Sequence, residues 1–339
     1  MIDLRSDTVT KPTPGMKEAM FNSPLGDDVF GEDPTVNSLQ ERLANEFGHE
    51  AGLFCSSGTM TNQLGIQVHT QPGDEVICSY WSHVYNYEGG GIAKNSGASV
   101  RLYPDPIISV DAIAERINPV DDHYARTTTV CVEDTVNKAG GLCHDIEDLK
   151  TASSFCRDQG LNFHLDGARV MNALVAKEHD WRTYGQLFDS ISICLSKGMG
   201  CPVGSVLIGS KDFISEAHRN RKSMGGGMRQ AGVLAAAGLY ALDHHVNRMQ
   251  EDHDNAKMLA NTLKSQPWVT NVVTPESNII VFELNGLSSA EFQQTLQESG
   301  ILALPFGSQK MRFVTHLDVS KEDISKACDI LSDINPIGT

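Results

Sequence analysis

The chain has 339 residues, of which 40% are hydrophobic, and this can bury a core large enough for one large domain and a smaller one. Its formal net charge of -16 at pH 7 argues against a general role in binding nucleic acid or anionic membranes. The first residues contain no apolar signal-peptide core, and the longest strongly apolar stretch, 231–242, is too short to span a bilayer, so a cytoplasmic location is expected.

Short apolar runs alternate with helical patterns along the first two thirds of the chain. The N-terminal dozen residues are expected to be extended because of Pro12 and Pro14. This alternation predicts βαβ units and a largely parallel sheet in an α/β fold, with ligands at the carboxyl ends of the strands. Strands are predicted at 51–55, 75–79, 128–133, 162–166 and 190–195, and helices from 59, from 84 and at 146–158.

The last third of the chain is patterned differently. A helical stretch that begins at Gln230 and breaks near His244 precedes strands at 278–284 and 310–315. We therefore expect two domains. Residues 1–243 would form an N-terminal segment and a large ligand-binding domain, and residues 244–339 a small C-terminal α+β domain.

The cysteine and histidine patterns do not indicate a metal site. The eight cysteines include no C-x-x-C pair, and the twelve histidines show no H-E-x-x-H or paired Cys/His spacing. Neither a secreted disulfide framework nor a tightly bound metal is expected, and most of the cysteines should be small core residues.

Two polar residues at predicted strand ends indicate cofactor chemistry. Lys197 follows the strand 190–195, and a lysine amine there can form a Schiff base when it is neutral, although a lysine that ends a strand is usually a solvated charge. Asp166 ends the strand 162–166, and its carboxylate could keep a pyridine nitrogen protonated, so that the ring accepts the electron pair left on Cα. The ordinary alternative is that Asp166 caps the next helix or pairs with Arg169.

Three further features could bind an anion or a flat ring. Ser-Ser-Gly-Thr at 56–59 lies between a predicted strand and helix, where it could cradle a phosphate or simply cap the helix. Several cations surround three glycines at 221–230, which indicates an anion site or a solvated basic loop. His83 follows a strand and could stack on a ring or move a proton, although packing is the commoner role of a lone histidine.

With these residues placed, the chain closely resembles the threonine aldolases, which are fold-type I pyridoxal 5'-phosphate (PLP) enzymes. The resemblance implies an aspartate-aminotransferase-like large domain and PLP as the cofactor. It also implies that the chain is a lyase that cleaves L-threonine, L-allo-threonine and other L-β-hydroxy-α-amino acids to glycine and an aldehyde. The resemblance covers nearly the whole length and is carried by residues 3–10, 26–36, 57–60, 164–169, 194–198, 225–230 and 314–318.

The resemblance implies a cofactor role for five matching residues. Lys197 would hold PLP as a Schiff base, and Asp166 would pair with the pyridine nitrogen. His83 would stack on the ring, while Gly58 and Thr59 would hold the phosphate.

It likewise implies which residues bind the substrate and which act between subunits. Ser6, Arg169 and Arg312 would bind the amino-acid carboxylate, with Arg169 also next to the cofactor. Lys222 and Arg229 would approach a cofactor site, and that site could belong to a neighbouring subunit of a homotetramer.

Three positions depart from the family pattern. Phe30 stands where the family often has Tyr, and the usual Glu-Asn-Thr-His-Asn run has Asp134 and Val136 at its second and fourth positions. Contacts to the far edge of the cofactor, or the preferred side chain, could therefore differ. Tyr85 and Tyr87 could also alter the pocket for the aldehyde part of the substrate.

The base and the reaction type stay open at the level of sequence. His83, His123 or a water between them could remove the β-hydroxyl proton, since His123 matches a family histidine near the substrate side chain. Fold and cofactor would also suit another PLP reaction, such as β-elimination or transamination, with pyruvate or a keto acid as product. A catalytically silent binding protein that retains the fold would lack the cofactor absorption band.

Overall fold

A seven-stranded sheet forms the centre of the larger part of the molecule. In the computed structural model, which describes residues 1–334, the strand order is β2-β8-β7-β6-β5-β3-β4. The predicted mostly parallel α/β sheet is confirmed, because only β8 (Ser205–Gly209) runs antiparallel, between β7 and β2. The other strands are β2 (Ala51–Cys55), β3 (Glu75–Ser79), β4 (Ser99–Tyr103), β5 (Thr127–Glu133), β6 (Asn162–Gly167) and β7 (Ser190–Cys194).

Helices cover both faces of this sheet, and so its central strands are apolar on both sides. In β8, Val206 and Ile208 belong to the main core cluster on one face, while Leu207 packs in a second cluster on the other. The main cluster is covered by α2 (Pro34–Phe47), α6 (Ile146–Asp158) and α10 (Gly232–His244), and the second by α3 (Gly58–His69) and α9 (Lys211–Ser223).

Side-chain caps fix where the longer helices begin. Ser57 accepts a hydrogen bond from the backbone N–H of Met60 at 3.2 Å and starts α3, and Asp145 accepts one from Glu147 at 2.8 Å and starts α6. The helix expected from residue 84 is a single turn, because the chain turns left-handed at Gly89 and Gly90 soon after it. The remaining helices of this part are α1 (Pro14–Phe21), α4 (His83–Asn86), α5 (Val110–Ala114), α7 (Val170–Lys177) and α8 (Trp181–Gly185).

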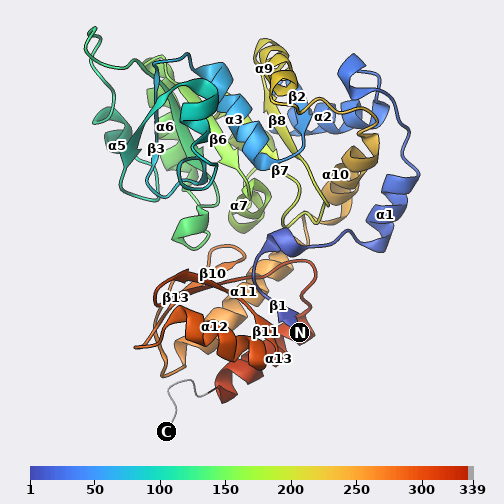
Figure 1. Cartoon of the computed structure of the whole chain (residues 1–339), viewed down its shortest axis with the longest axis vertical. Coiled ribbons are helices and arrows are strands. Elements are labelled where there is room, and N and C mark those ends of the chain that lie inside the picture. The colour runs from blue at the N-terminus through green and yellow to red at the C-terminus, as the bar shows by residue number, and fades with distance from the viewer. Residues whose placement is uncertain (335–339) are drawn as a thin grey trace.

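The last third of the chain builds a second sheet with its own core (Figure 1). The expected break near His244 is confirmed, since α10 ends there and α11 begins at Met249. The division of the chain at residue 243 stays a prediction, and residues 335–339 of the expected C-terminal domain lie outside the described residues. The antiparallel order is β12-β13-β10-β9, with β9 (Val269–Val272), β10 (Ile279–Leu284), β12 (Leu304–Gly307), β13 (Lys310–Val314), α11 (Met249–Lys264), α12 (Ser289–Glu298) and α13 (Lys321–Asp333).

The first residues of the chain pack with this second core. The strand β1 (Ile2–Asp3) pairs in parallel with β11 (Ile301–Leu302), and the two lie side by side in Figure 1. Ile2 and Leu4 are buried in the C-terminal cluster. The first residues of the chain therefore contribute apolar side chains to the core of the small domain. The chain then crosses to the larger part through a short 3-10 helix at Asp7–Val9.

Most of the apolar stretch 231–242 lies in the buried helix α10, which packs against α1 and α2. Across residues 1–334, no helix combines the length and the apolar character needed to cross a membrane.

The packing of β1 predicts a large stability cost for one N-terminal substitution. Leu4 is fully buried, so Leu4→Ala should lower the free energy of unfolding by roughly 2–5 kcal/mol. Leu304→Ala is the matched control, because Leu304 is 38% exposed and its loss should change stability by less than about 0.5 kcal/mol. Thermal melts of both variants test this, and equal melting temperatures would show that the N-terminal segment at Leu4 does not contribute to the C-terminal core.

Candidate active site

The polar residues predicted at strand ends meet at one edge of the large sheet. Glu133 ends β5, Asp166 lies near the end of β6, and Lys197 follows β7 by three residues. Because β5, β6 and β7 are parallel neighbours in register, their carboxyl ends share that edge. The helix α7, which continues from β6, lies on the side of the large sheet that faces the small domain (Figure 1).

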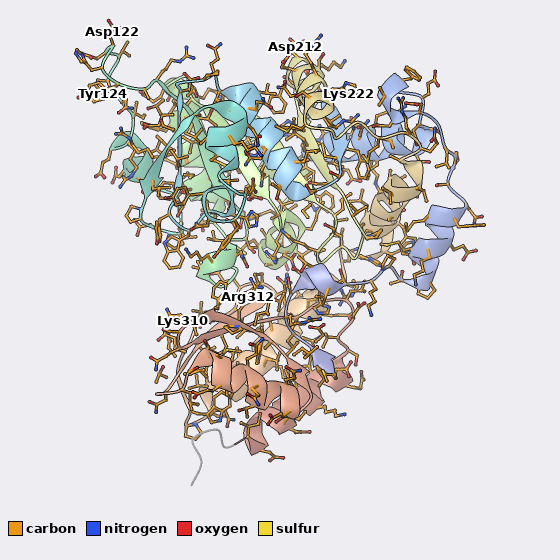
Figure 2. All side chains as sticks on the ribbon, in the orientation of Figure 1. Asp122, Tyr124, Asp212, Lys222, Lys310 and Arg312 are labelled. Atoms are coloured by element: carbon orange, nitrogen blue, oxygen red, sulfur yellow. The ribbon has the colours of Figure 1, made fainter. Side chains whose placement is uncertain are left out.

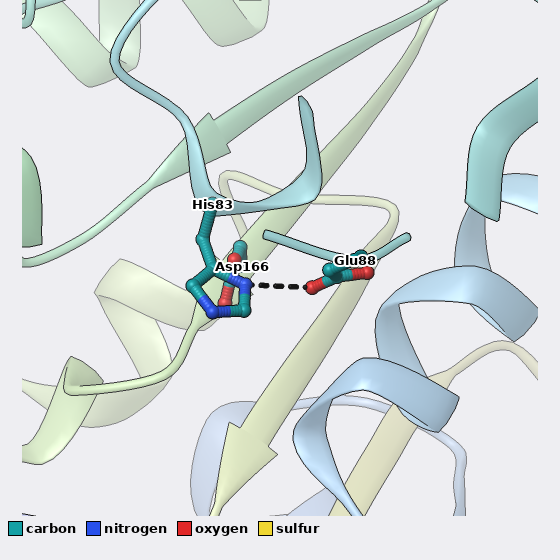
Figure 3. A group of neighbouring side chains, drawn as sticks. All are labelled: His83, Glu88 and Asp166. Carbon is teal, nitrogen blue, oxygen red and sulfur yellow. Dashed lines mark hydrogen bonds and ion pairs between the residues drawn. The ribbon is translucent and has the colours of Figure 1, made fainter. Parts of the chain in front are cut away.

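His83, Glu88 and Asp166 form a compact group at this edge (Figure 3). The Nδ1 atom of His83 lies 2.9 Å from Oε1 of Glu88, and one polar atom of each residue lies within 4.8 Å of the other two. The imidazole is seen in front of the Asp166 carboxylate in Figure 3. The backbone N–H of His83 donates to Oε2 of Glu133 at 2.7 Å, so that Glu133 fixes the start of α4.

The surrounding carboxylates raise the pKa of the His83 imidazole. Burial alone would lower the pKa of the imidazole, but the hydrogen bond to Glu88 and the charges of Asp166 and Glu133 raise it above the usual value. Burial and the neighbouring Asp166 raise the pKa of Glu133 to about 7. The site thus favours a proton on His83 more strongly than water does.

Asp166 presents a carboxylate oxygen for a ligand. The residue is 1% exposed, and Oδ1 accepts a hydrogen bond from the backbone N–H of Ala168 at 3.1 Å. Its Oδ2 atom has no hydrogen-bond partner within residues 1–334. The alternative in which Asp166 pairs with Arg169 is not observed, because Arg169 pairs with Asp7. A buried acceptor of this kind is expected to be satisfied by a bound donor.

Asp7 and Arg169 form a buried ion pair that the sequence did not single out. Nε and Nη2 of Arg169 each donate to one oxygen of Asp7 at 2.7 Å, and Asn278 donates a third hydrogen bond at 3.2 Å. Burial would raise the pKa of Asp7, but Arg169 and Lys197 hold it well below its usual range. Thr10 Oγ1 bonds to the carbonyls of both Asp7 and Lys197 at 2.9 Å, so the backbone of Lys197 lies beside this segment. The only sequence signal for Asp7 was its position next to Ser6 in a family segment.

Arg312 on β13 is available for an anion. Its Nη1 donates to Oδ1 of Asn137 at 2.9 Å and its Nη2 to the carbonyl of Arg5 at 3.2 Å, while Nε has no partner in the described part of the chain. Burial, together with the charge of Arg169, lowers the pKa of Arg312 to about 10. A negative ligand would offset this cost, and Figure 2 shows Arg312 at the junction of the two domains.

Ser6, Gly58 and Thr59 also lie at structural positions that suit a site. Ser6 is buried and caps the 3-10 helix by accepting from the N–H of Thr8 at 3.2 Å. Gly58 begins α3, and a Cβ atom there would reach the Cys194 side chain at 3.7 Å, while Thr59 is exposed in the first turn. The free N–H groups of this turn can bind a phosphate.

One copy of the chain does not bring the other predicted residues to this group. The His123 side chain is 89% exposed and bonds to Asp121 at 2.7 Å, and its neighbours Asp122 and Tyr124 are far from Arg312 in Figure 2. Lys222, near the end of α9, is likewise far from Arg312 in that view.

The positions that depart from the family pattern have different surroundings. Phe30 is exposed, with the guanidinium of Arg229 at 5.9 Å from its ring centroid, and Arg229 pairs with Asp27 at 2.8 Å. Val136 is buried, and Tyr85 is exposed.

Tyr87 and Asp134, the two remaining positions, each lie next to an identified side chain. The Tyr87 ring is exposed and lies 5.5 Å from that of His83 between centroids, so it borders the proposed site. Asp134 is buried, its Oδ2 accepts from the Tyr184 hydroxyl at 2.7 Å, and burial raises its pKa to about 7.

Comparison with known proteins gives a consistent family. Residues 3–285 match the model of the family described as β-eliminating lyase. The chain is 42% identical over 333 residues to the low specificity L-threonine aldolase of Escherichia coli strain K12, covering 96% of this chain and 97% of the relative. It is 40% identical to the probable low-specificity L-threonine aldolase 2 of Arabidopsis thaliana, covering 95% and 94%.

Solved structures support the same fold. The threonine aldolase of Leishmania major has a TM-score of 0.84 at 20% identity and covers 98% of both chains. A putative L-allo-threonine aldolase from Listeria monocytogenes has a TM-score of 0.81 at 21% identity, covering 98% of this chain and 95% of that one. At these identities the likeness shows the fold, which is that of the fold-type I PLP enzymes.

The burial of Asp134 predicts a specific pH dependence of stability. Its pKa is raised by folding, so the stability it contributes is present at pH values below its unfolded pKa and is lost as pH rises through about 7. Asp134→Asn keeps an acceptor for Tyr184 and removes the titrating group. The variant should raise the melting temperature at pH 8 by a few degrees and much less at pH 5.

Thermal melts between pH 5 and pH 8 measure this difference. Asp122→Asn, which changes an exposed aspartate, is the control and should melt like the wild type at both pH values. Equal effects of Asp134→Asn at the two pH values would contradict the assignment.

Proposed function

The chain belongs to the threonine aldolases within the β-eliminating lyase family, and from this premise we propose that it cleaves L-threonine and L-allo-threonine to glycine and acetaldehyde. As a carbon–carbon lyase it would cleave other L-β-hydroxy-α-amino acids to glycine and the matching aldehyde. The observation that carries the proposal is that Lys197 and Asp166 follow neighbouring strand ends beside His83, while Arg312 of β13 bonds to Asn137 in the turn that follows β5. An amine, a buried carboxylate, an imidazole and a guanidinium are the groups that this chemistry needs.

The residues at the sheet edge fit PLP. Asp166 Oδ2 lacks a donor among residues 1–334, which suits a protonated pyridine nitrogen, and the first turn of α3 at Gly58 and Thr59 suits its phosphate. Lys197 supplies the amine for covalent attachment. When bound, the cofactor supplies an electron sink for the pair released at Cα.

Arg312 would bind the substrate carboxylate. Two of its nitrogens are already fixed by Asn137 and by the carbonyl of Arg5, so the planar group is held in place before the substrate arrives. Arg169 uses Nε and Nη2 on Asp7 and can contribute through Nη1 alone. Holding the carboxylate orients the Cα–Cβ bond for cleavage, and Ser6 would support it.

His83 would accept the β-hydroxyl proton at Nε2. Its Nδ1 is engaged by Glu88 at 2.9 Å, whereas the imidazole of His123 is on an exposed loop of the same chain. A proton acceptor must lie within hydrogen-bond reach of the substrate, so within one copy His83 is favoured.

We also propose that the active enzyme is a homotetramer with shared sites. Lys222 and Arg229 lie outside the site of their own chain, and Lys222 lines a basic pocket with His218 and Arg219. Phe21, Leu25 and Phe30 are largely exposed on the same N-terminal segment, where a second copy would cover them. The three apolar side chains and the cations of the pocket are thus accessible on the surface of a single chain, as a contact with a second copy requires.

A cytoplasmic location is part of the same proposal. All eight cysteines are free thiols within the described residues, and seven of them are buried. This pattern suits a reducing compartment.

A product assay tests the reaction. Purified protein with PLP should release glycine and acetaldehyde from L-threonine and L-allo-threonine. Pyruvate from L-serine would favour β-elimination, the reaction for which the matching family is named, and a keto acid would favour transamination.

Replacing Lys197 tests the cofactor attachment. Lys197→Ala should leave a folded protein without the absorption band of covalently bound PLP and without detectable turnover, because the proposed point of covalent attachment is removed. Lys211→Ala, at the exposed start of α9, is the control and should keep both. Normal turnover by Lys197→Ala would end the assignment.

Replacing Arg312 tests the carboxylate site. Arg312→Leu should lower kcat/KM for L-threonine roughly 10- to 150-fold, since a hydrogen bond to a charged group contributes about 1.5–3 kcal/mol. Lys310→Ala, on the same strand and paired with Glu283, should leave kcat/KM unchanged. An unchanged value for Arg312→Leu would place the carboxylate elsewhere.

A further inference from the structure

A buried row of hydrogen bonds runs from the core of the large sheet to His83. It involves α3 and the strands β6 and β7, and none of its members except His83 was singled out in the sequence as catalytic. The contacts are His69 Nε2 to Ser190 Oγ at 2.7 Å, Ser190 Oγ to His164 Nδ1 at 2.8 Å, His164 Nε2 to Asn62 Oδ1 at 3.3 Å, Asn62 Nδ2 to Glu88 Oε1 at 2.9 Å and Glu88 Oε1 to His83 Nδ1 at 2.9 Å.

Glu88 is the acceptor on which this row converges. Its side chain is fully buried, Oε1 accepts from Asn62, and Oε2 accepts from Nε2 of Gln63 at 2.6 Å. An ionised carboxylate can only accept hydrogen bonds. The Nδ1 atom of His83, at 2.9 Å, must therefore be the donor to Glu88.

The hydrogen bonds between His69 and Asn62, at the other end of the row, are also donated toward Glu88. Asn62 uses its N–H on Glu88, so its oxygen must accept from His164 Nε2, and the other nitrogen of His164 then accepts from Ser190. Burial lowers the pKa of His164 to about 3 and that of His69 to about 4, so both rings are neutral and have one donor each. Each donor in the row therefore points toward Glu88.

The helix packing makes room for this arrangement. A Cβ atom at Gly65 of α3 would come within 2.6 Å of the His164 ring. Only glycine lets α3 lie close enough for Asn62 to bridge His164 and Glu88. The same helix begins at Gly58, so the row connects the His83 imidazole to the helix that would hold the phosphate.

We propose that Glu88 is a positioning residue, which holds His83 with its proton on Nδ1 and its lone pair on Nε2 facing the substrate. This inference rests on the proposed aldolase function. As the Cα–Cβ bond breaks and the aldehyde carbonyl forms, the β-hydroxyl proton moves to Nε2 of His83. The electron pair of the broken bond stays on Cα, which then takes up one proton, either from the resulting imidazolium or from solvent, to give glycine. The imidazolium is stabilised by Glu88, and when solvent protonates Cα it returns its own proton to solvent.

Several charged or titratable groups face His83, and each bears on its titration. Glu88 contacts Nδ1, Asp166 and Glu133 approach from β6 and β5, and the Tyr87 ring lies at the end of α4. The carboxylates favour the imidazolium, so activity that needs a neutral Nε2 is lost as pH falls through a raised pKa. Removing one carboxylate charge should move that loss to lower pH.

The test compares Glu88→Gln with Glu88→Asp across pH. Glutamine keeps an acceptor for Nδ1 but has no charge, so the acid limb of kcat/KM for L-threonine should move down by about one pH unit or more. Aspartate keeps the charge, so the acid limb of the Glu88→Asp variant should stay near that of the wild type. Its kcat should fall, because the shorter side chain displaces the His83 imidazole. Glu46→Gln, which changes a surface partner of Arg42, should leave the limb and kcat unchanged.

A second readout does not depend on turnover. Diethyl pyrocarbonate modifies neutral imidazoles, and peptide mass spectrometry of the purified enzyme gives the pH midpoint for His83 and, in the same digest, for the exposed His123. Glu88→Gln should lower the midpoint of His83 alone. Melting temperatures of all variants report whether they fold.

The outcomes separate the two proposals. Wild-type protein that releases no aldehyde would count against the proposed function. An active wild type whose acid limb and His83 midpoint both stay in place on Glu88→Gln would overturn the role of Glu88, even if the variant were less stable.

Discussion

The buried pair of Asp7 and Arg169 joins the three parts of the molecule that build the site. Asp7 lies in the N-terminal segment that pairs with the small domain, Arg169 follows β6 of the large sheet, and Asn278 of the small domain donates to the same carboxylate. Loss of one member would leave a buried charge at a cost of about 3–5 kcal/mol. Two further hydrogen bonds attach site residues to the same N-terminal segment: Thr10 Oγ1 bonds to the carbonyls of Asp7 and Lys197 at 2.9 Å, and Nη2 of Arg312 donates to the Arg5 carbonyl.

The ends of the large-sheet strands could be predicted because the apolar runs stop where the strands do. Lys197 and Asp166 were placed in this way, and the buried face of each strand follows from the same runs. Glu88 could not be found, because it follows a one-turn helix in a glycine-rich loop, and its role depends on donors from α3 that are about 25 residues away in sequence. The pairing of β1 with β11 could not be predicted either, because two strands of two residues each carry no sequence pattern that identifies which strands pair.

Residues carried over from the family fall into two groups. Those on strand ends and on β13 lie around the sheet edge of a single chain, whereas Lys222, Arg229 and His123 lie on its outside. A resemblance to a family points to both groups equally well, because matching motifs do not tell where each residue lies relative to the others. Their placement within one chain makes the distinction, because it separates the residues at the sheet edge from those that lie outside it.

The pairing of the second residue with residue 301 has a consequence for biosynthesis. At a translation rate of about 5–20 residues per second, the N-terminal strand leaves the ribosome roughly 15–60 s before its partner is made. During that time Asp7 can meet Arg169, but the last sheet and Arg312 do not yet exist. If Arg312 binds the substrate carboxylate as we propose, a nascent chain cannot bind an amino acid productively, and we expect the growing polypeptide to stay catalytically silent until it is almost complete.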